Sequence, residues 1–131
     1  MKAYVLDTHI LWWHLTNNSK KLSRAAQRAF REGERGEALL YVPVIALLEL
    51  WDANKNSGGV IDFRRVVRTL QQASQFIFVP LDMDDVWAYD DLTAIPGSRD
   101  RMIAAAAIKM SAPLITVDQQ IIASGAVEVL E

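Results

Sequence analysis

The sequence of 131 residues predicts an α/β protein in which helices cover both faces of a mainly parallel sheet of four or five strands, a three-layer αβα sandwich. Short apolar runs typical of buried strands alternate along the chain with amphipathic stretches typical of helices. Strands separated by helices need crossover connections, and these favour parallel neighbours. The composition, 51% hydrophobic and 23% charged, suits a packed core, so residues 1–131 are expected to form a single domain.

The elements of the first half follow from apolar runs and from residues that start helices. The segments 3–6 and 38–42 are short and apolar, which is typical of buried strands. Ser23 and Asp62 can cap helices, and Pro43 suits a first helical turn. The helices expected here run over 8–15, from Ser23 to the closing Gly33 and Gly36, over 43–50, and over 62–73 after a loop at 56–59.

The second half continues the same alternation. The apolar segment 76–79 predicts a third strand, 114–117 predicts a fourth that ends at Asp118, and 127–130 predicts a fifth. Asp82 is expected to cap a helix near 84–92, and Ser98 a helix over 99–110. A last helical turn is expected at 119–123, and the chain contains no internal repeat or linker.

Composition excludes several classes of function. The chain has no cysteine, which excludes disulfides, thiolate metal sites and cysteine nucleophiles. Its net charge of −2 means that any contact with nucleic acid must come from a local basic patch. No apolar run approaches the length of about 18 residues that spans a bilayer, and the N-terminus lacks the apolar core of a signal peptide. We therefore expect a cytoplasmic protein with no membrane partner.

Four acidic residues stand where solvation does not readily explain them. Asp7 and Asp118 follow predicted strands, Glu49 interrupts an apolar helical run, and Asp100 begins a helix that continues with apolar residues. In an open parallel sheet, sites form beyond the carboxyl ends of the strands. If the strands before Asp7 and Asp118 are neighbours, the four side chains can converge at that edge.

Converging carboxylates repel one another, so such a cluster must bind a cation or take up protons. Oxygen ligands without sulfur point to Mg²⁺ or Mn²⁺, and such an ion supports hydrolysis of phosphodiester bonds. Each acid also has a purely structural interpretation. These interpretations are a helix cap at Asp7 and at Asp118, a favourable charge at the start of a helix at Asp100, and a solvent-facing position at Glu49.

The same residues resemble a known family. The segments Val5–His9, Asp100–Ala105 and Leu114–Asp118, with the helix that carries Glu49 between them, are similar to the PIN domain, specifically to the VapC-type toxin ribonucleases of toxin–antitoxin pairs. The resemblance covers essentially the whole chain and implies a PIN-like fold. It also implies a catalytic, metal-binding role for Asp7, Glu49, Asp100 and Asp118 and a supporting role for the Thr116 hydroxyl.

The activity that the resemblance implies is that of a Mg²⁺-dependent endoribonuclease. The family members cleave RNA such as tRNA, are inhibited by a small antitoxin and often pair as homodimers. Asp7 and Asp100 would be direct metal ligands, with Glu49 and Asp118 completing the site. Pro43 and Ala46 stand where relatives often carry small hydroxyl residues, which leaves a second hypothesis, a catalytically inert PIN-fold module that binds RNA or protein.

Several arginines are candidates for RNA contact. Arg24, Arg28 and Arg31 recur at helical spacing with Arg35, so they form one stripe that can follow an RNA backbone or simply face solvent. Arg99 can contact a phosphate, and Arg101 can either pair with a carboxylate or contact a phosphate. The neighbouring Trp12 and Trp13 indicate core packing, a partner surface, or both.

Overall fold

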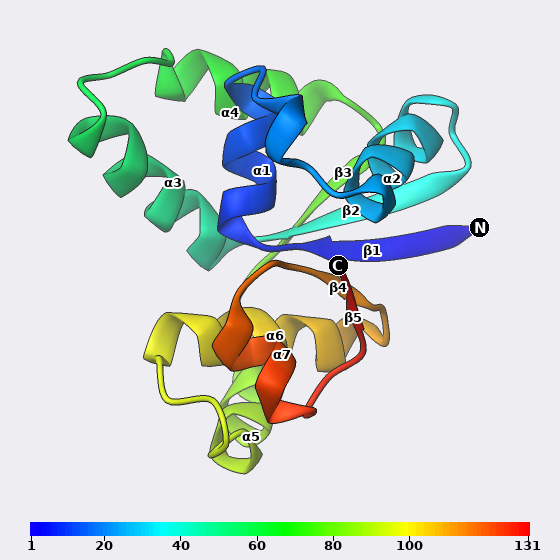
Figure 1. Ribbon diagram of the computed structural model, residues 1–131, viewed down its shortest axis with the longest axis vertical. Helices are drawn as coiled ribbons and strands as arrows, with labels where there is room; N and C mark the ends of the chain where they lie inside the picture. The colour runs from blue at the N-terminus through cyan, green and yellow to red at the C-terminus, as the bar shows by residue number, and fades with distance from the viewer.

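The computed structural model describes all 131 residues and shows a five-stranded sheet between two layers of helices (Figure 1). The strands are β1 (Lys2–Leu6), β2 (Ala38–Pro43), β3 (Phe76–Val79), β4 (Leu114–Ile115) and β5 (Val129–Leu130). They lie in the order β3-β2-β1-β4-β5, and every neighbouring pair is parallel. The predicted α/β class is therefore confirmed, and the sheet is parallel throughout.

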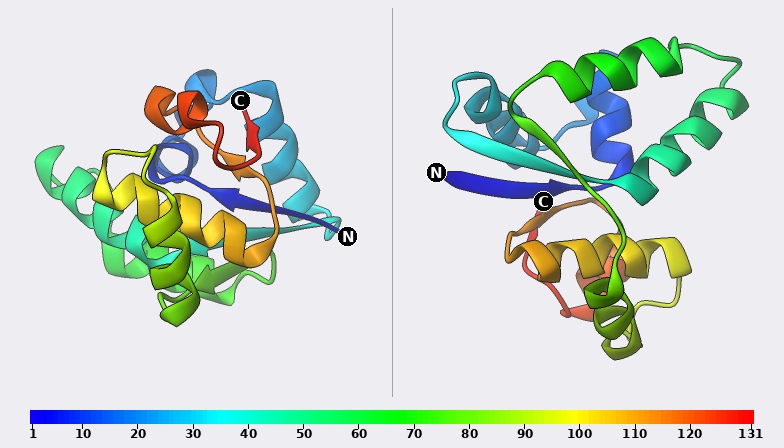
Figure 2. Two further views of the ribbon diagram at one scale, coloured as in Figure 1. Left: turned by 90° about the horizontal axis from the view of Figure 1, so that it is seen from below. Right: turned by 180° about the vertical axis from the view of Figure 1, so that it is seen from behind.

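Helices cover the two faces of the sheet unequally (Figures 1 and 2). On one side lie α1 (Thr8–Leu15), α2 (Arg24–Glu34), α3 (Val44–Asn56) and α4 (Phe63–Gln72), and on the other lie α5 (Met83–Asp91), α6 (Ser98–Met110) and α7 (Gln119–Ser124). A 3₁₀ turn at Ser19–Lys21, which the sequence pattern did not predict, joins α1 to α2. No helix has both the length and the apolar character needed to cross a membrane.

Each face of the sheet carries its own apolar core. Leu6 and Leu40 pack with α1, α2 and α4 on one face, whereas Val5 and Leu114 pack with α6 and α7 on the other. Successive residues of a strand point to opposite faces, so the central strand β1 contributes to both cores. This is why its sequence is continuously apolar up to Asp7.

Several boundaries differ from the expected ones, and the structure explains three of these differences. The helix predicted over 43–50 continues to Asn56, because nothing breaks it before Gly58 and Gly59, which adopt positive φ angles. The strand predicted over 114–117 ends at Ile115, since the next residue, Thr116, turns its hydroxyl toward neighbouring side-chain and backbone groups. Gly97, not Ser98, precedes α6 as its N-cap.

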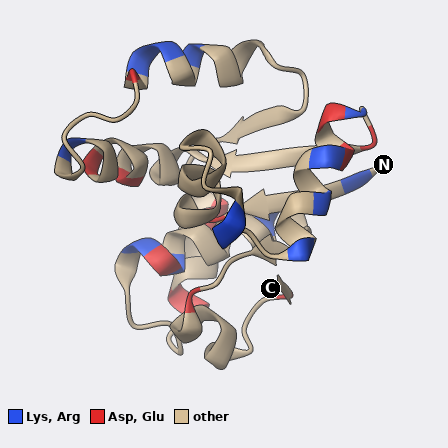
Figure 3. Cartoon of the chain, turned by 45° about the horizontal axis from the view of Figure 1, so that its top comes forward, with Lys and Arg blue, Asp and Glu red and all other residues tan.

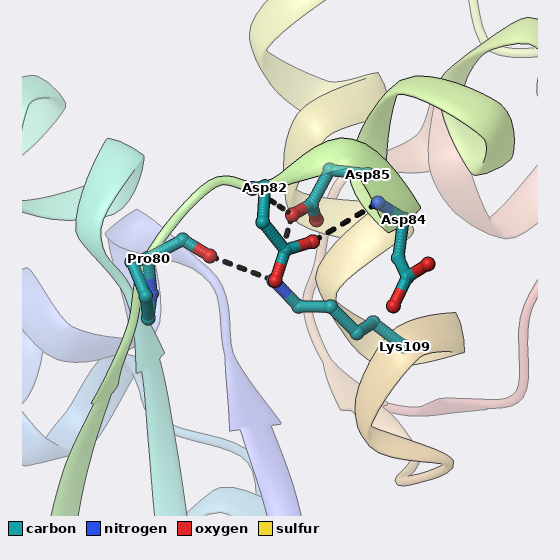
Figure 4. A network of polar contacts seen from close by, with 5 residues as sticks. All are labelled: Pro80, Asp82, Asp84, Asp85 and Lys109. Atoms are coloured by element: carbon teal, nitrogen blue, oxygen red, sulfur yellow. Dashed lines mark hydrogen bonds and ion pairs between the residues drawn. The ribbon is translucent and has the colours of Figure 1, made fainter.

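A buried ion pair fixes the segment that leads from β3 into α5 against α6. Lys109 Nζ donates hydrogen bonds to Asp85 Oδ2 at 2.6 Å and to the carbonyl oxygen of Pro80 at 2.7 Å (Figure 4). Asp82 lies 3.5 Å from the same ammonium group and forms a capping box with Asp85 at the start of α5. The second Asp85 oxygen, Oδ1, is buried without a partner, so the ammonium of Lys109 is the main compensation for this charge.

Replacing Lys109 with methionine is expected to lower the free energy of unfolding by about 3 kcal/mol, because Asp85 would remain buried without its counter-charge. Chemical denaturation of the purified protein measures this change. Most of the lost stability should return in the Lys109→Met/Asp85→Leu double variant. A single variant as stable as the wild type would show that the ion pair contributes little.

Candidate active site

The carboxyl end of the central strand β1 positions Asp7. Its backbone N–H donates to the carbonyl oxygen of Ile115 at 3.1 Å, which ties this residue to β4. Its Oδ1 accepts a hydrogen bond from the N–H of Thr8 at 2.7 Å, and its Oδ2 accepts one from the Thr116 hydroxyl at 2.5 Å. Asp7 is only 5% exposed, so these two donors are what allow a carboxylate to lie here.

Thr116 links Asp7 to Asp118. The Thr116 side chain is fully buried, donates to Asp7, and accepts a hydrogen bond from the N–H of Asp118 at 3.0 Å. Asp118 Oδ1 in turn accepts from the N–H groups of Gln120 and Ile121 at the start of α7. Asp118 is therefore the N-cap of α7, in agreement with its structural interpretation. The same hydrogen bonds hold its carboxyl group beside β1.

Glu49 reaches the same edge of the sheet from α3. This helix begins directly after β2, the neighbour of β1. Glu49 is half-buried, and its Oε1 accepts a hydrogen bond from the Thr8 hydroxyl at 2.9 Å. Thr8 thus contacts two of the four acids, Asp7 through its N–H and Glu49 through its hydroxyl. The sequence pattern did not predict this role of Thr8, although a hydroxyl residue directly after a strand-end aspartate could have indicated it.

Asp100 lies in the first turn of α6 and folds back over Gly97. A methyl group added at position 97 would come within 2.8 Å of Asp100 Oδ2. Any larger residue at position 97 would displace the Asp100 carboxylate. This role of Gly97, like that of Thr8, was not predicted from the sequence. The helix N-terminus beneath Asp100 carries a partial positive charge, which favours a carboxylate at this position.

The four carboxylates, termed here the acidic cluster, influence one another's ionisation. The pKa of Asp100 is raised to about 6, first by burial and then by the charges of Asp118, Asp7 and Glu49. Burial also raises the pKa of Asp7, although the hydrogen bonds from Thr116 and Thr8 oppose it. The pKa of Glu49 is raised by burial and, more weakly, by Asp7. Residues far apart in the sequence repel in this way only when the fold brings them together.

The donor set of the acidic cluster fits a divalent cation. It consists of carboxylate oxygens, the ligands that Mg²⁺ and Mn²⁺ prefer. Each Asp7 oxygen accepts one hydrogen bond and keeps a further lone pair. No group of three or more Asp, Glu or His side chains in the structure is arranged so that it could hold a metal ion. Metal binding by Asp7, Glu49, Asp100 and Asp118 therefore stays a prediction.

The arginines expected to contact RNA lie in different settings. Arg24, Arg28 and Arg31 are exposed on α2, which lies toward the end of the sheet near the N-terminus (Figures 1 and 3). The acidic cluster lies at the opposite end, where the strands finish.

Arg99 and Arg101 lie beside the acidic cluster but have protein partners. Arg99 forms an exposed ion pair with Asp52 at 3.0 Å. Arg101 Nε donates to the carbonyl oxygen of Ile95 at 2.8 Å, and its guanidinium lies 4.7 Å from the ring centroid of Tyr89. Of the two alternatives for Arg101, the structure does not show the pairing with a carboxylate, and contact with a phosphate stays a prediction. A backbone oxygen and an aromatic ring take the place of the carboxylate.

Comparison with known proteins identifies the family. A model of the PIN domain matches residues 4–125. The chain belongs to the PIN domain family. The resemblance of the acidic motifs to the PIN domain is thus confirmed. No curated protein matches the sequence at a significant level.

Several solved structures share this PIN fold. A chain of VapBC2 from Rickettsia felis, crystallised with a DNA fragment from its promoter, has a TM-score of 0.74 at 16% identity, covering 98% of this chain and 97% of that one. DNA-bound VapBC from Salmonella typhimurium gives 0.73 at 18% identity, with coverages of 99% and 98%. FitAcB from Neisseria gonorrhoeae gives 0.66 at 17% identity, with coverages of 98% and 96%. At these identities the likeness shows the fold.

Replacing Thr116 with valine removes the hydroxyl that orders Asp7 and Asp118 while keeping the side-chain volume. We expect the affinity for Mn²⁺ to fall about 10–100-fold, as for other residues that orient metal ligands. Calorimetric titration of the folded variant with Mn²⁺ measures this. Thr69→Val, on the exposed face of α4, is the matched control, and equal affinities for both variants would contradict a supporting role for Thr116.

Replacing Asp100 with asparagine should stabilise the metal-free protein, because it removes a charge that burial and, after it, the three neighbouring carboxylates disfavour. The ionised form is disfavoured in the fold, so wild-type stability is lost as the pH rises from about 4 through about 6. At pH 7.5 in EDTA we expect a gain of about 1 kcal/mol, well below the full shift because Asp100 is only half-buried. Thermal denaturation measures it, and a destabilised variant would argue against repulsion.

Proposed function

We propose that this PIN domain is a Mg²⁺- or Mn²⁺-dependent endoribonuclease, the toxin of a type II toxin–antitoxin system, that cleaves tRNA or another structured RNA in the cytoplasm. The observation that carries the proposal is the convergence of four carboxylates at the carboxyl end of the sheet. Membership of the PIN family supports it. The fold shared with chains of VapBC complexes supports the assignment to toxin–antitoxin systems.

In this proposal Asp7 and Asp100 hold the cation. When bound, the cation would contact phosphate oxygens and lower the pKa of an attacking water. Thr8 and Thr116 hold the Asp7 carboxylate in one orientation through two hydrogen bonds. Burial of Asp7 against two apolar cores keeps bulk water from its oxygens and strengthens its interaction with a cation.

Glu49 and Asp118 complete the site in different ways. The raised pKa of Glu49 suits it to accept a proton from the attacking water at neutral pH. The Thr8 hydroxyl orients its Oε1. Asp118 is held by two backbone N–H groups through one oxygen, which suits it to positioning a water. In this proposal a water attacks phosphorus as the bond from phosphorus to a ribose oxygen breaks, and that oxygen leaves with a proton from solvent. No covalent intermediate forms, so no nucleophilic side chain is needed.

The proposed toxin would act with two protein partners, a small antitoxin and a second copy of itself. Half of the exposed large apolar side chains lie on α3 and α5, and exposed apolar surface is typical of interaction sites. These side chains are Val44, Leu48 and Trp51 on α3, and Met83, Val86 and Trp87 on α5. An antitoxin and a homodimer would each need such a surface.

The alternative, an inert PIN-fold module, rests on Pro43 and Ala46. Both are buried, and Ala46 is part of the core that contains α6. Neither side chain takes part in the hydrogen bonds that order the acids. Those hydrogen bonds form with proline and alanine at these positions, so we favour the nuclease.

The conservative change Asp7→Asn is expected to reduce RNA cleavage at least 100-fold, because it removes a ligand charge from the cation site while keeping the shape of the side chain. Purified protein is incubated with labelled tRNA and Mg²⁺, and products are separated on a denaturing gel. Asp84→Asn, an exposed acid on α5, is the matched control and should cleave like the wild type. Cleavage that persists in excess EDTA would refute a metal-dependent nuclease.

A further inference from the structure

A row of aromatic and basic side chains runs along α1 and into the 3₁₀ turn that follows it. His9 is exposed, and its ring centroid lies 5.9 Å from that of Trp13 with an angle of 41° between the planes. Beyond Trp13, the Nζ of Lys21 lies 5.8 Å from the Trp13 ring centroid. The three side chains thus form a short, continuous surface of two rings and one cation.

One end of this row adjoins the acidic cluster. His9 follows Asp7 and Thr8 directly in the first turn of α1, the helix that begins where β1 ends. The other end leads to the exposed Lys20 and to Arg24 at the start of α2. The row therefore lies between the carboxylates and the basic stripe of α2, two features that the proposed function places on the same RNA.

Core packing explains only part of these residues. Trp13 is half-buried and packs partly against the core formed with α2, which accounts for one side of its ring. His9 is exposed and belongs to neither core, and Lys21 is also exposed. A histidine and a lysine that flank an indole at the surface are suited to a ligand that has both an aromatic face and a negative charge.

We propose that His9, Trp13 and Lys21 form a platform that stacks one unpaired nucleobase of the RNA beside the scissile phosphate. The inference rests on the proposed function and adds the form of the substrate. Nucleobases stack on aromatic rings only when they are freed from a duplex, and cations hold the adjoining phosphates. The platform therefore selects single-stranded segments, such as loops within a folded RNA, over continuous duplex.

The test measures RNA binding without cleavage, so that it does not depend on catalysis. Proteins carrying Asp7→Asn are titrated into a fluorescein-labelled 10-nucleotide RNA of mixed sequence, either single-stranded or annealed to its complement, and anisotropy is recorded. We expect the single strand to bind more tightly than the duplex. Adding His9→Ala should weaken single-strand binding at least five-fold, whereas His9→Tyr, which keeps an aromatic ring, should bind within two-fold of the parent.

Further variants separate stacking from folding. Trp13→Leu keeps an apolar side chain against the core but removes the ring, and it should lose affinity as His9→Ala does. Ile108→Ala, which removes an exposed apolar side chain from α6 in the opposite helical layer, is the matched control and should bind like the parent. Circular dichroism melting confirms that each variant is folded, and His9 is safe to change because it is exposed.

Two outcomes would overturn the platform. One is unchanged single-strand affinity in both His9→Ala and Trp13→Leu, and the other is tighter binding of the duplex. Failure of the nuclease proposal is seen separately, as absence of Mg²⁺-dependent cleavage of any RNA by the protein with an intact Asp7.

Discussion

The buried negative charge of Asp7 is the constraint on which the rest of the site depends. A carboxylate with 5% of its surface exposed needs hydrogen-bond donors, and Thr8 and Thr116 supply the two that Asp7 has. The Thr116 donor requires β4 to lie next to β1. The same hydroxyl then accepts the N–H of Asp118 and ends β4 after two residues. The position of β4 beside β1, the short length of β4 and the N-cap of α7 are thus all connected to the hydrogen bonds that allow Asp7 to be buried.

The acidic cluster sets stability against function. Three of its four members have a raised pKa, so in the absence of a cation each one would be more stable ionised in water than in the fold. The protein limits this cost by leaving Glu49, Asp100 and Asp118 half-buried and by hydrogen bonding the buried Asp7 twice. The apolar cores on both faces of the sheet must compensate for what remains. A cation or proton that neutralises these carboxylates would stabilise the fold, as a ligand does when it binds to its site.

Much of the fold was predictable because its signals are local. Apolar runs gave the strands, and Ser23, Asp62 and Asp82 do cap helices as expected. The position of Asp118 beside Asp7 was conditional, because strand order is decided by long-range packing that no local pattern encodes. The roles of Thr8 and Gly97 were missed for the same reason, since each acts on a side chain that only the folded chain brings near. The partners of Arg101, a carbonyl oxygen and a tyrosine ring, could not be predicted either, because both are brought near it only by the folded chain.

The distribution of charge determines how a polyanion could approach this protein. The chain carries a net charge of −2, and its four convergent carboxylates would repel a phosphate backbone at the point where chemistry is proposed to occur. Attraction must therefore come from elsewhere, and the exposed arginines of α2 lie at the far end of the sheet. A strand of RNA held there still has to cross α1 to reach Asp7. The aromatic and basic row on α1 spans that interval, where stacking, unlike charge, is not weakened by the nearby acids.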